Sequence, residues 1–206
     1  MIRSYRYDPG EHHRRSIRLK GYDYSQAGAY FVTVCTQGRV CLFGGVVEGE
    51  MRVNVAGRMV EKWWAELSNK FPNVETDEYN VMPNHFHGIV VIVGADLRVC
   101  PEPTGAHDEI TGAHTGAPLP EIVQWFKTMT TNEYIRGVKT SRWPLCPGRL
   151  WQRNYYEHII RNEESLNRIR EYIANNPLQW EVDRENPNRI GTVREAPRLQ
   201  DEPWHV

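Results

Sequence analysis

The stretch YNVMPNHFHGIVVIV, residues 79–93, is the most informative part of this chain. Residues 86–93 are apolar and rich in β-branched side chains, a pattern that predicts a buried β-strand. Pro83 and Asn84 precede it and predict a turn that leads the chain into the strand. The remaining elements are therefore expected to form around this strand.

Two histidines lie at the start of that strand, separated by Phe86. Alternate side chains of a strand point to the same face, so His85 and His87 project together while Phe86 points into a core. Two adjacent imidazoles on a rigid strand form half of a metal site. The alternative is a hydrogen-bonded strand end without metal. A structural zinc site would need more cysteine or histidine at short spacing, and none is nearby.

Composition indicates a globular chain with locally concentrated charge. The 206 residues are 40% hydrophobic and carry a net charge of −1, which excludes a global field that attracts nucleic acid. Residues 1–20 form a basic N-terminal arm, which is either a local phosphate-binding segment or a solvated terminus. Residues 181–206 form a polar C-terminal tail, expected to be loosely ordered.

Cysteine usage and hydropathy indicate a cytoplasmic protein. The four cysteines, at 35, 41, 100 and 146, match no zinc or haem spacing. The charged N-terminal residues do not resemble a signal peptide. No apolar run approaches the roughly 18 residues of a membrane span.

The order of the remaining elements predicts an α+β domain with a central, mostly antiparallel sheet and flanking helices. Residues 94–118, with a repeated Thr-Gly-Ala-His, predict a flexible insert. Asn162 is expected to cap the last helix, and Pro177 to stop it. The expected elements are a strand at 29–36, a hairpin at 40–54, a helix at 56–68, strands at 74–82 and 86–93, a helix from 121, an extended segment at 150–161 and a helix from 163 to about 175.

The last helix places two further polar groups on one face. Tyr172 and Asn176 are four residues apart, so they lie one turn apart on the same side. If that side meets His85 and His87, the mixed nitrogen and oxygen donors suit Mg²⁺ or Mn²⁺ better than a closed zinc site. The ion would act as a Lewis acid on a phosphodiester, with the tyrosine as nucleophile.

At this point the chain shows a resemblance to a known family. MPNHFHG at 82–88 and YIANNP at 172–177, supported by RLKGYDY at 18–24, IVQWFK at 122–127 and LWQR at 150–153, resemble the single-tyrosine HUH transposases. The REP-associated tyrosine transposase branch, related to transposases of single-strand insertion sequences, is the most similar. The resemblance covers residues 14 to 180.

The resemblance implies a ferredoxin-like HUH domain over residues 21–180 that cuts and rejoins single-stranded DNA at REP-like hairpins. Tyr172 takes the position of the nucleophile and would form a 5′-phosphotyrosine, releasing a 3′-hydroxyl. His85 and His87 take metal-ligand positions. Asn176 takes the third, where insertion-sequence relatives often have glutamine. The resemblance also implies a monomer, although the insertion-sequence relatives are dimers.

Rival residues and rival functions accompany this interpretation. Tyr155 and Tyr156 form a tandem pair, which other HUH enzymes use as nucleophiles, but Tyr172 has the amide partner one turn away. The alternatives in function are a hairpin-DNA-binding protein without catalysis, a rolling-circle-type nicking enzyme and a metal phosphoesterase without a covalent step. Candidate DNA contacts are Arg14, Arg15, Arg18, Lys20, Lys127, Arg153, Trp151, Tyr155, Tyr156 and His158.

Overall fold

The computed structural model describes residues 19, 21–94 and 116–189. Its centre is a four-stranded sheet in the order β4-β5-β1-β6, in which every neighbouring pair is antiparallel. The two central strands, β5 and β1, are therefore paired on both sides. The strands are β1 (Gly28–Cys35), β4 (Val74–Val81), β5 (His85–Ile92) and β6 (Tyr156–Ile160).

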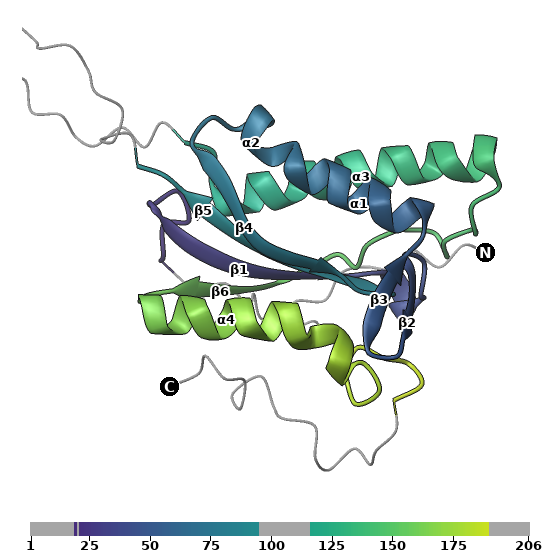
Figure 1. Ribbon diagram of the computed structural model, residues 1–206. Coiled ribbons are helices and arrows are strands. Elements are labelled where there is room, and N and C mark those ends of the chain that lie inside the picture. The colour runs from purple at the N-terminus through teal and green to yellow at the C-terminus, as the bar shows by residue number, and fades with distance from the viewer. Residues whose placement is uncertain (1–18, 20, 95–115, 190–206) are drawn as a thin grey trace, which may run out of the picture.

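Helices cover both faces of this sheet (Figure 1). The upper face in that view carries α1 (Val55–Ala65), α2 (Leu67–Lys70) and α3 (Leu119–Ser141), and the lower face carries α4 (Glu163–Asn175). Leaving aside the hairpin and α4, the chain order is strand, helix, strand, strand, helix, strand, which is the ferredoxin-like arrangement. The predicted α+β class is confirmed.

Smaller elements lie at one end of the sheet. The hairpin of β2 (Gly44–Val47) and β3 (Glu50–Val53) forms its own two-stranded sheet. The short helices η1 (Gln37–Arg39) and η3 (Asn176–Gln179) follow β1 and α4. Pro177 thus lies inside a 3₁₀ turn that continues directly from α4, rather than in an extended segment.

Side chains of β5 point alternately to the two faces of the sheet, and each face has its own apolar core. Phe86 points to the upper face, as expected, where its ring lies 4.6 Å from that of Trp64 on α1. Gly88 faces the same helix, and a Cβ atom there would lie only 2.5 Å from the Trp64 ring. The glycine therefore lets an indole pack directly against the strand that carries the histidines.

The lower core attaches α4 to the sheet. Asn162 caps α4 as predicted, accepting from the Ser165 amide at 2.8 Å. Farther along, the Arg170 guanidinium donates twice to Asp77, at 2.9 and 2.5 Å, beside an irregularity in the β4–β5 pairing that follows Thr76. The cluster between α4 and the sheet is Phe31, Ile89, Ile160, Ile169 and Ile173.

Several predicted segments lie outside the described residues. They are residues 1–18 and 20 of the basic arm, with Arg14, Arg15, Arg18 and Lys20, residues 95–115 of the insert, and residues 190–206 of the tail. Residues 181–189 are described, and they pack against the sheet rather than extending from it, since Glu185 and Asn186 are buried. None of the helices within the described ranges has the length and apolar character needed to cross a bilayer.

Candidate active site at the start of β5

His85 and His87 lie together on the lower face of the sheet, where α4 covers it. Their side chains are buried, with exposed fractions of 0% and 3%. The two Nε2 atoms are 3.0 Å apart. The predicted pair of imidazoles is therefore formed, and it is directed at one point between the strand and the helix.

The side chain of Asn84 fixes the tautomer of His85. Its amide nitrogen donates to the carbonyl oxygens of Arg39 and Glu185, at 3.0 and 2.7 Å. The amide oxygen therefore faces His85 Nδ1, 2.9 Å away, so Nδ1 carries the proton. This leaves the Nε2 lone pair directed at the other imidazole, as a metal ligand requires.

Thr33 orients the second imidazole without selecting its tautomer, because a hydroxyl can donate or accept. Its hydroxyl lies 2.8 Å from His87 Nδ1, in the cross-strand position on β1.

Burial lowers the pKa of His85, although nearby carboxylates and Asn176 partly oppose that effect. Burial and the neighbouring imidazole hold the pKa of His87 well below its usual range. Both rings are therefore neutral near pH 7, the form that binds metal.

Tyr172 on α4 and Asn176, the first residue of η3, both lie beside the histidines. The Tyr172 ring lies 5.4 Å from that of His87 and packs edge-on against Phe31 at 6.1 Å. Asn176 is 2% exposed and lies close enough to His85 to oppose the lowering of that imidazole's pKa, while its buried amide oxygen makes no hydrogen bond of good geometry. The Asn80 side chain donates to the Ile173 carbonyl at 3.1 Å, which holds this turn of α4 against the sheet.

These donors fit a hard divalent ion. Adjacent ligands about 2.1 Å from an octahedral ion are about 3.0 Å apart, which matches the separation of the two Nε2 atoms. The same separation suits an N–H···N hydrogen bond without the ion. No group of three or more His, Cys, Asp and Glu side chains in the described ranges is arranged to hold a metal. The buried amide oxygen of Asn176 is a candidate for the third protein donor.

Two carboxylates from residues 181–189 complete the surroundings of His85, and the sequence analysis missed both. Asp183 Oδ2 lies 3.8 Å from His85 Nε2. Glu185 pairs with Arg39 Nε at 2.9 Å and Arg184 Nε at 3.2 Å. Burial alone would raise the pKa of Glu185, but the two guanidinium groups lower it overall. No local pattern signalled the contacts with His85 and Arg39, because those residues are distant in sequence from Asp183 and Glu185.

The tandem tyrosines point to opposite faces of the sheet. Tyr155 packs against the upper core. Tyr156 packs in the lower cluster, with its ring 6.2 Å from Phe31. Of this pair, Tyr156 shares a face with the histidines, and Tyr172 on α4 has a ring contact to His87.

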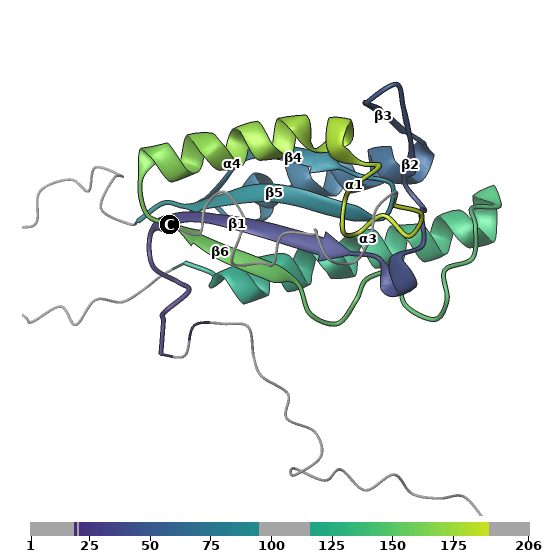
Figure 2. The same ribbon diagram turned by 90° about the horizontal axis from the view of Figure 1, so that it is seen from below.

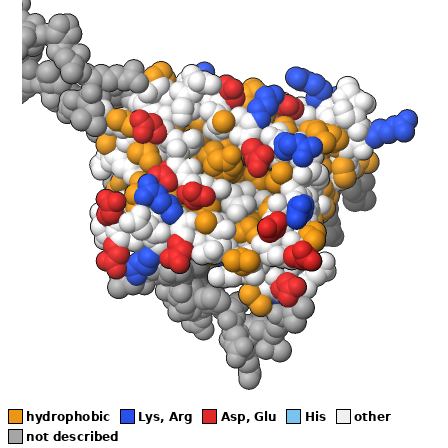
Figure 3. Space-filling view, viewed as in Figure 1, with side chains coloured by type: hydrophobic (Ala, Val, Ile, Leu, Met, Phe, Trp, Pro, Cys, Tyr) orange, Lys and Arg blue, Asp and Glu red, His pale blue; other side chains and the backbone are white. Residues whose placement is uncertain are grey.

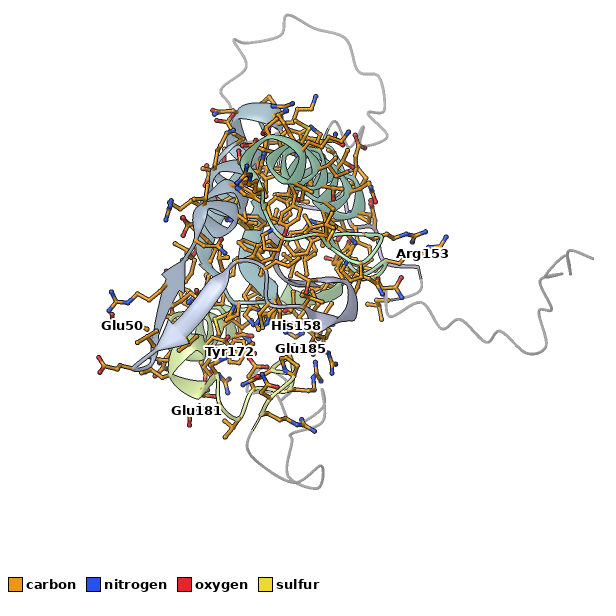
Figure 4. The ribbon with its side chains drawn as sticks, turned by 90° about the vertical axis from the view of Figure 1, so that its right-hand side faces the viewer. Glu50, Arg153, His158, Tyr172, Glu181 and Glu185 are labelled. Carbon is orange, nitrogen blue, oxygen red and sulfur yellow. The ribbon has the colours of Figure 1, made fainter. Side chains whose placement is uncertain are left out.

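The other predicted DNA contacts separate into distinct groups. Trp151 is a core residue, 4% exposed with its indole N–H donating to Thr130, so the prediction that it stacks on bases is wrong. Lys127 donates to two backbone carbonyls of the loop before β6, and burial lowers its pKa to about 8. Arg153 is exposed and points away from the site, whereas His158 lies on the α4 side of β6 (Figure 4).

Comparison with known proteins identifies a relative along nearly the whole chain. An uncharacterized protein of Haemophilus influenzae strain Rd is 40% identical over 179 residues, which cover 86% of this chain and 96% of that protein. This chain belongs to the same family. No protein-family model matches the sequence.

Two solved structures are similar to this member of the family. One is a REP-associated tyrosine transposase bound to a REP hairpin, with a TM-score of 0.49 and 19% identity over 79% of this chain and 73% of that chain. The other is a candidate transposase from Deinococcus radiodurans R1, with a TM-score of 0.41 and 17% identity over 77% and 95%. Both are transposases by name.

Proposed function

We propose that this protein is a metal-dependent enzyme that cuts and rejoins single-stranded DNA through a covalent link to Tyr172. One observation carries the proposal. Strand β5, helix α4 and the start of η3 bring together two buried neutral imidazoles, the buried amide of Asn176 and the ring of Tyr172. Those groups are the ones that a single-tyrosine phosphodiester transfer requires.

His85, His87 and Asn176 would hold a divalent ion, Mg²⁺ or Mn²⁺. When bound, the ion supplies Lewis-acid stabilisation of the charge on the phosphate. The protein's own contribution is orientation: Asn84 and Thr33 fix the rings, and the buried setting excludes water.

Tyr172 would attack the phosphorus of the scissile phosphodiester. The new bond joins its phenolic oxygen to phosphorus, and the bond from phosphorus to the 3′ oxygen breaks. The phenol proton passes to solvent, and the departing 3′ oxygen takes a proton from water. In rejoining, a 3′-hydroxyl attacks the phosphotyrosine, and Tyr172 leaves and is reprotonated, so the phosphodiester energy is conserved.

The proposed substrate is a hairpin of the REP type with an adjacent single strand. The two motifs that resemble REP-associated tyrosine transposases support this choice. The surface drawn in Figure 3 intersperses Lys and Arg with Asp and Glu, without a broad region of one sign. Affinity would therefore come from local phosphate contacts and base stacking rather than from a long-range field.

A covalent-adduct assay tests the proposal. The purified protein is incubated with Mn²⁺ and labelled hairpin oligonucleotides drawn from the DNA that flanks its own coding region, and the products are separated on a denaturing gel. We expect a DNA–protein band that disappears in Tyr172→Phe and persists in the matched variant Tyr156→Phe. A band lost only in Tyr156→Phe would move the nucleophile to β6. Binding without any band would make the protein a DNA-binding module.

A further inference from the structure

The carboxylate of Glu185 lies between two guanidinium groups beside the candidate active site. Arg39 Nε contacts Oε2 at 2.9 Å, and Arg184 Nε contacts Oε1 at 3.2 Å. The Glu185 side chain is only 12% exposed, whereas those of Arg39 and Arg184 are 47% and 40% exposed. The two cations therefore remain accessible to a ligand from solution, while the anion that they hold is internal.

This pairing adjoins the histidine pair. Cys35 is the cross-strand neighbour of His85, and burial raises the pKa of its thiol, so the protonated thiol donates to Glu185 Oε2 at 3.5 Å. Viewed from below the sheet, the segment that carries Glu185 lies beside the end of β1 and the start of β5 (Figure 2). The same side of the sheet carries Tyr172 and Glu185 in Figure 4.

The backbone at residue 185 is anchored independently of its carboxylate. The carbonyl oxygen accepts from the Asn84 amide at 2.7 Å, and the N–H donates to Asp183 Oδ1 at 2.6 Å. Rotation of one side chain can therefore release the carboxylate while the segment stays in place. Asp183 directs its other oxygen at His85, not at the guanidinium groups.

The backbone of Arg39 is positioned independently of the ion pair. It ends η1 with a left-handed φ of 56°, after Gly38 at 68°. Its carbonyl oxygen accepts from Asn84. A non-glycine residue in this region is uncommon, and here it directs a cation toward the site.

We propose that Arg39 and Arg184 form an anion subsite for a backbone phosphate of the substrate strand, next to the phosphate held at His85 and His87, and that Glu185 occupies it in the DNA-free protein. The identity of the ligand rests on the proposed function. A phosphate offers the guanidinium groups the same pair of oxygens as a carboxylate does. On DNA binding the carboxylate would rotate into solvent, so Glu185 reduces the affinity for any strand that does not displace it.

The test compares Glu185→Gln with Glu181→Gln, an exposed glutamate of the same segment that points away from the sheet (Figure 4). Affinity for a labelled oligothymidylate of about twelve nucleotides is measured without metal at several salt concentrations. We expect Glu185→Gln to bind about 5–10-fold tighter, with a salt slope steeper by about 0.7, the value for one added phosphate contact. Glu181→Gln should behave like wild type, and Arg39→Gln in the Glu185→Gln background should cancel the gain.

Calorimetry with inorganic phosphate separates the subsite from the reaction. Glu185→Gln should bind phosphate more tightly than wild type, and the double variant should not. If these results hold while no covalent adduct forms, the subsite stands and the proposed reaction fails. A Glu185→Gln protein with an unchanged melting temperature and unchanged affinity for DNA and phosphate would overturn the subsite. If Glu185→Gln does not fold, the single variant Arg39→Gln provides the test. An Arg39→Gln protein that binds DNA as tightly as wild type would also overturn the subsite.

Discussion

Replacing Asn84 by alanine tests whether an amide buried behind the histidines controls metal binding. The side chain is fully buried and makes three hydrogen bonds, to His85 Nδ1 and to the carbonyl oxygens of Arg39 and Glu185. Alanine leaves the imidazole N–H with no acceptor in a closed site. The Glu185 carbonyl is buried, whereas the Arg39 carbonyl belongs to an exposed turn where water can partly replace the amide.

The expected loss in unfolding free energy is about 2–4 kcal/mol, counting the buried N–H at about 1–3 kcal/mol and the two carbonyls at less. A domain typically has about 5–15 kcal/mol in total, so the variant should remain folded. With the ring free to change tautomer, Mn²⁺ affinity should fall by about 10–100-fold, the usual effect of losing the partner of a ligating histidine.

Urea unfolding and calorimetric Mn²⁺ titration measure the two effects separately. Asn84→Asp is the matched variant, because a carboxylate still accepts from His85 but repels the two carbonyls. We expect it to lose stability while keeping Mn²⁺ affinity within a few-fold of wild type. A folded Asn84→Ala protein that binds Mn²⁺ as tightly as wild type would refute the assigned role of this amide.

Three further measurements address the scaffold and the ion. Gly88→Ala should lower the unfolding free energy in urea by about 2 kcal/mol, because its Cβ would overlap the indole of α1, while Gly45→Ala, with open space around it, should not. Arg170 lowers the pKa of Asp77, so Asp77→Asn should cost about 1 kcal/mol of unfolding free energy at pH 7, less in high salt. The stability difference between wild type and Asp77→Asn should shrink once the pH falls below 3.8, the ordinary pKa of aspartate in the unfolded chain. It should vanish when the pH has passed the lowered pKa of Asp77 in the folded protein, because the native carboxylate is then protonated. Mn²⁺ at about 100 times its dissociation constant should stabilise the wild-type protein against thermal unfolding by about 2.7 kcal/mol. An unchanged melting temperature in wild type would contradict the metal site. An equal gain in His87→Ala would contradict it as well.

The sequence allowed prediction of features that depend on local periodicity. The alternation of β5 placed His85 and His87 on one face and Phe86 on the other, as observed. The four-residue spacing of Tyr172 and Asn176 brought both beside the histidines, with Asn176 just after the end of α4, and Asn162 capped that helix. Each of these follows from the repeat of a strand or helix, so neighbouring residues suffice to predict it.

The missed features depend on chain segments that meet only in the folded protein. Asn84 was interpreted as a turn residue, yet its amide joins carbonyls 45 and 101 residues away in sequence. The start of the tail looked polar and loosely ordered, and its burial depends on that amide and on Arg39. Trp151 was assigned to DNA because polar and aromatic residues surround it in sequence, whereas the packing of α3 makes it part of the core.

One face of β5 packs in the larger core, and the other face carries the two histidines. The upper face gives the strand a continuous core with α1 and α3, and the ring of Phe86 lies there, directly behind the histidines. The lower face has a smaller apolar cluster, so α4 depends also on Asp77 and Asn80 for its position. The imidazoles are therefore fixed by the most stable part of the fold, while the tyrosine comes from a helix with fewer attachments. If Tyr172 is the proposed nucleophile, this arrangement would let it carry a covalently attached strand while the proposed metal ligands stay in place.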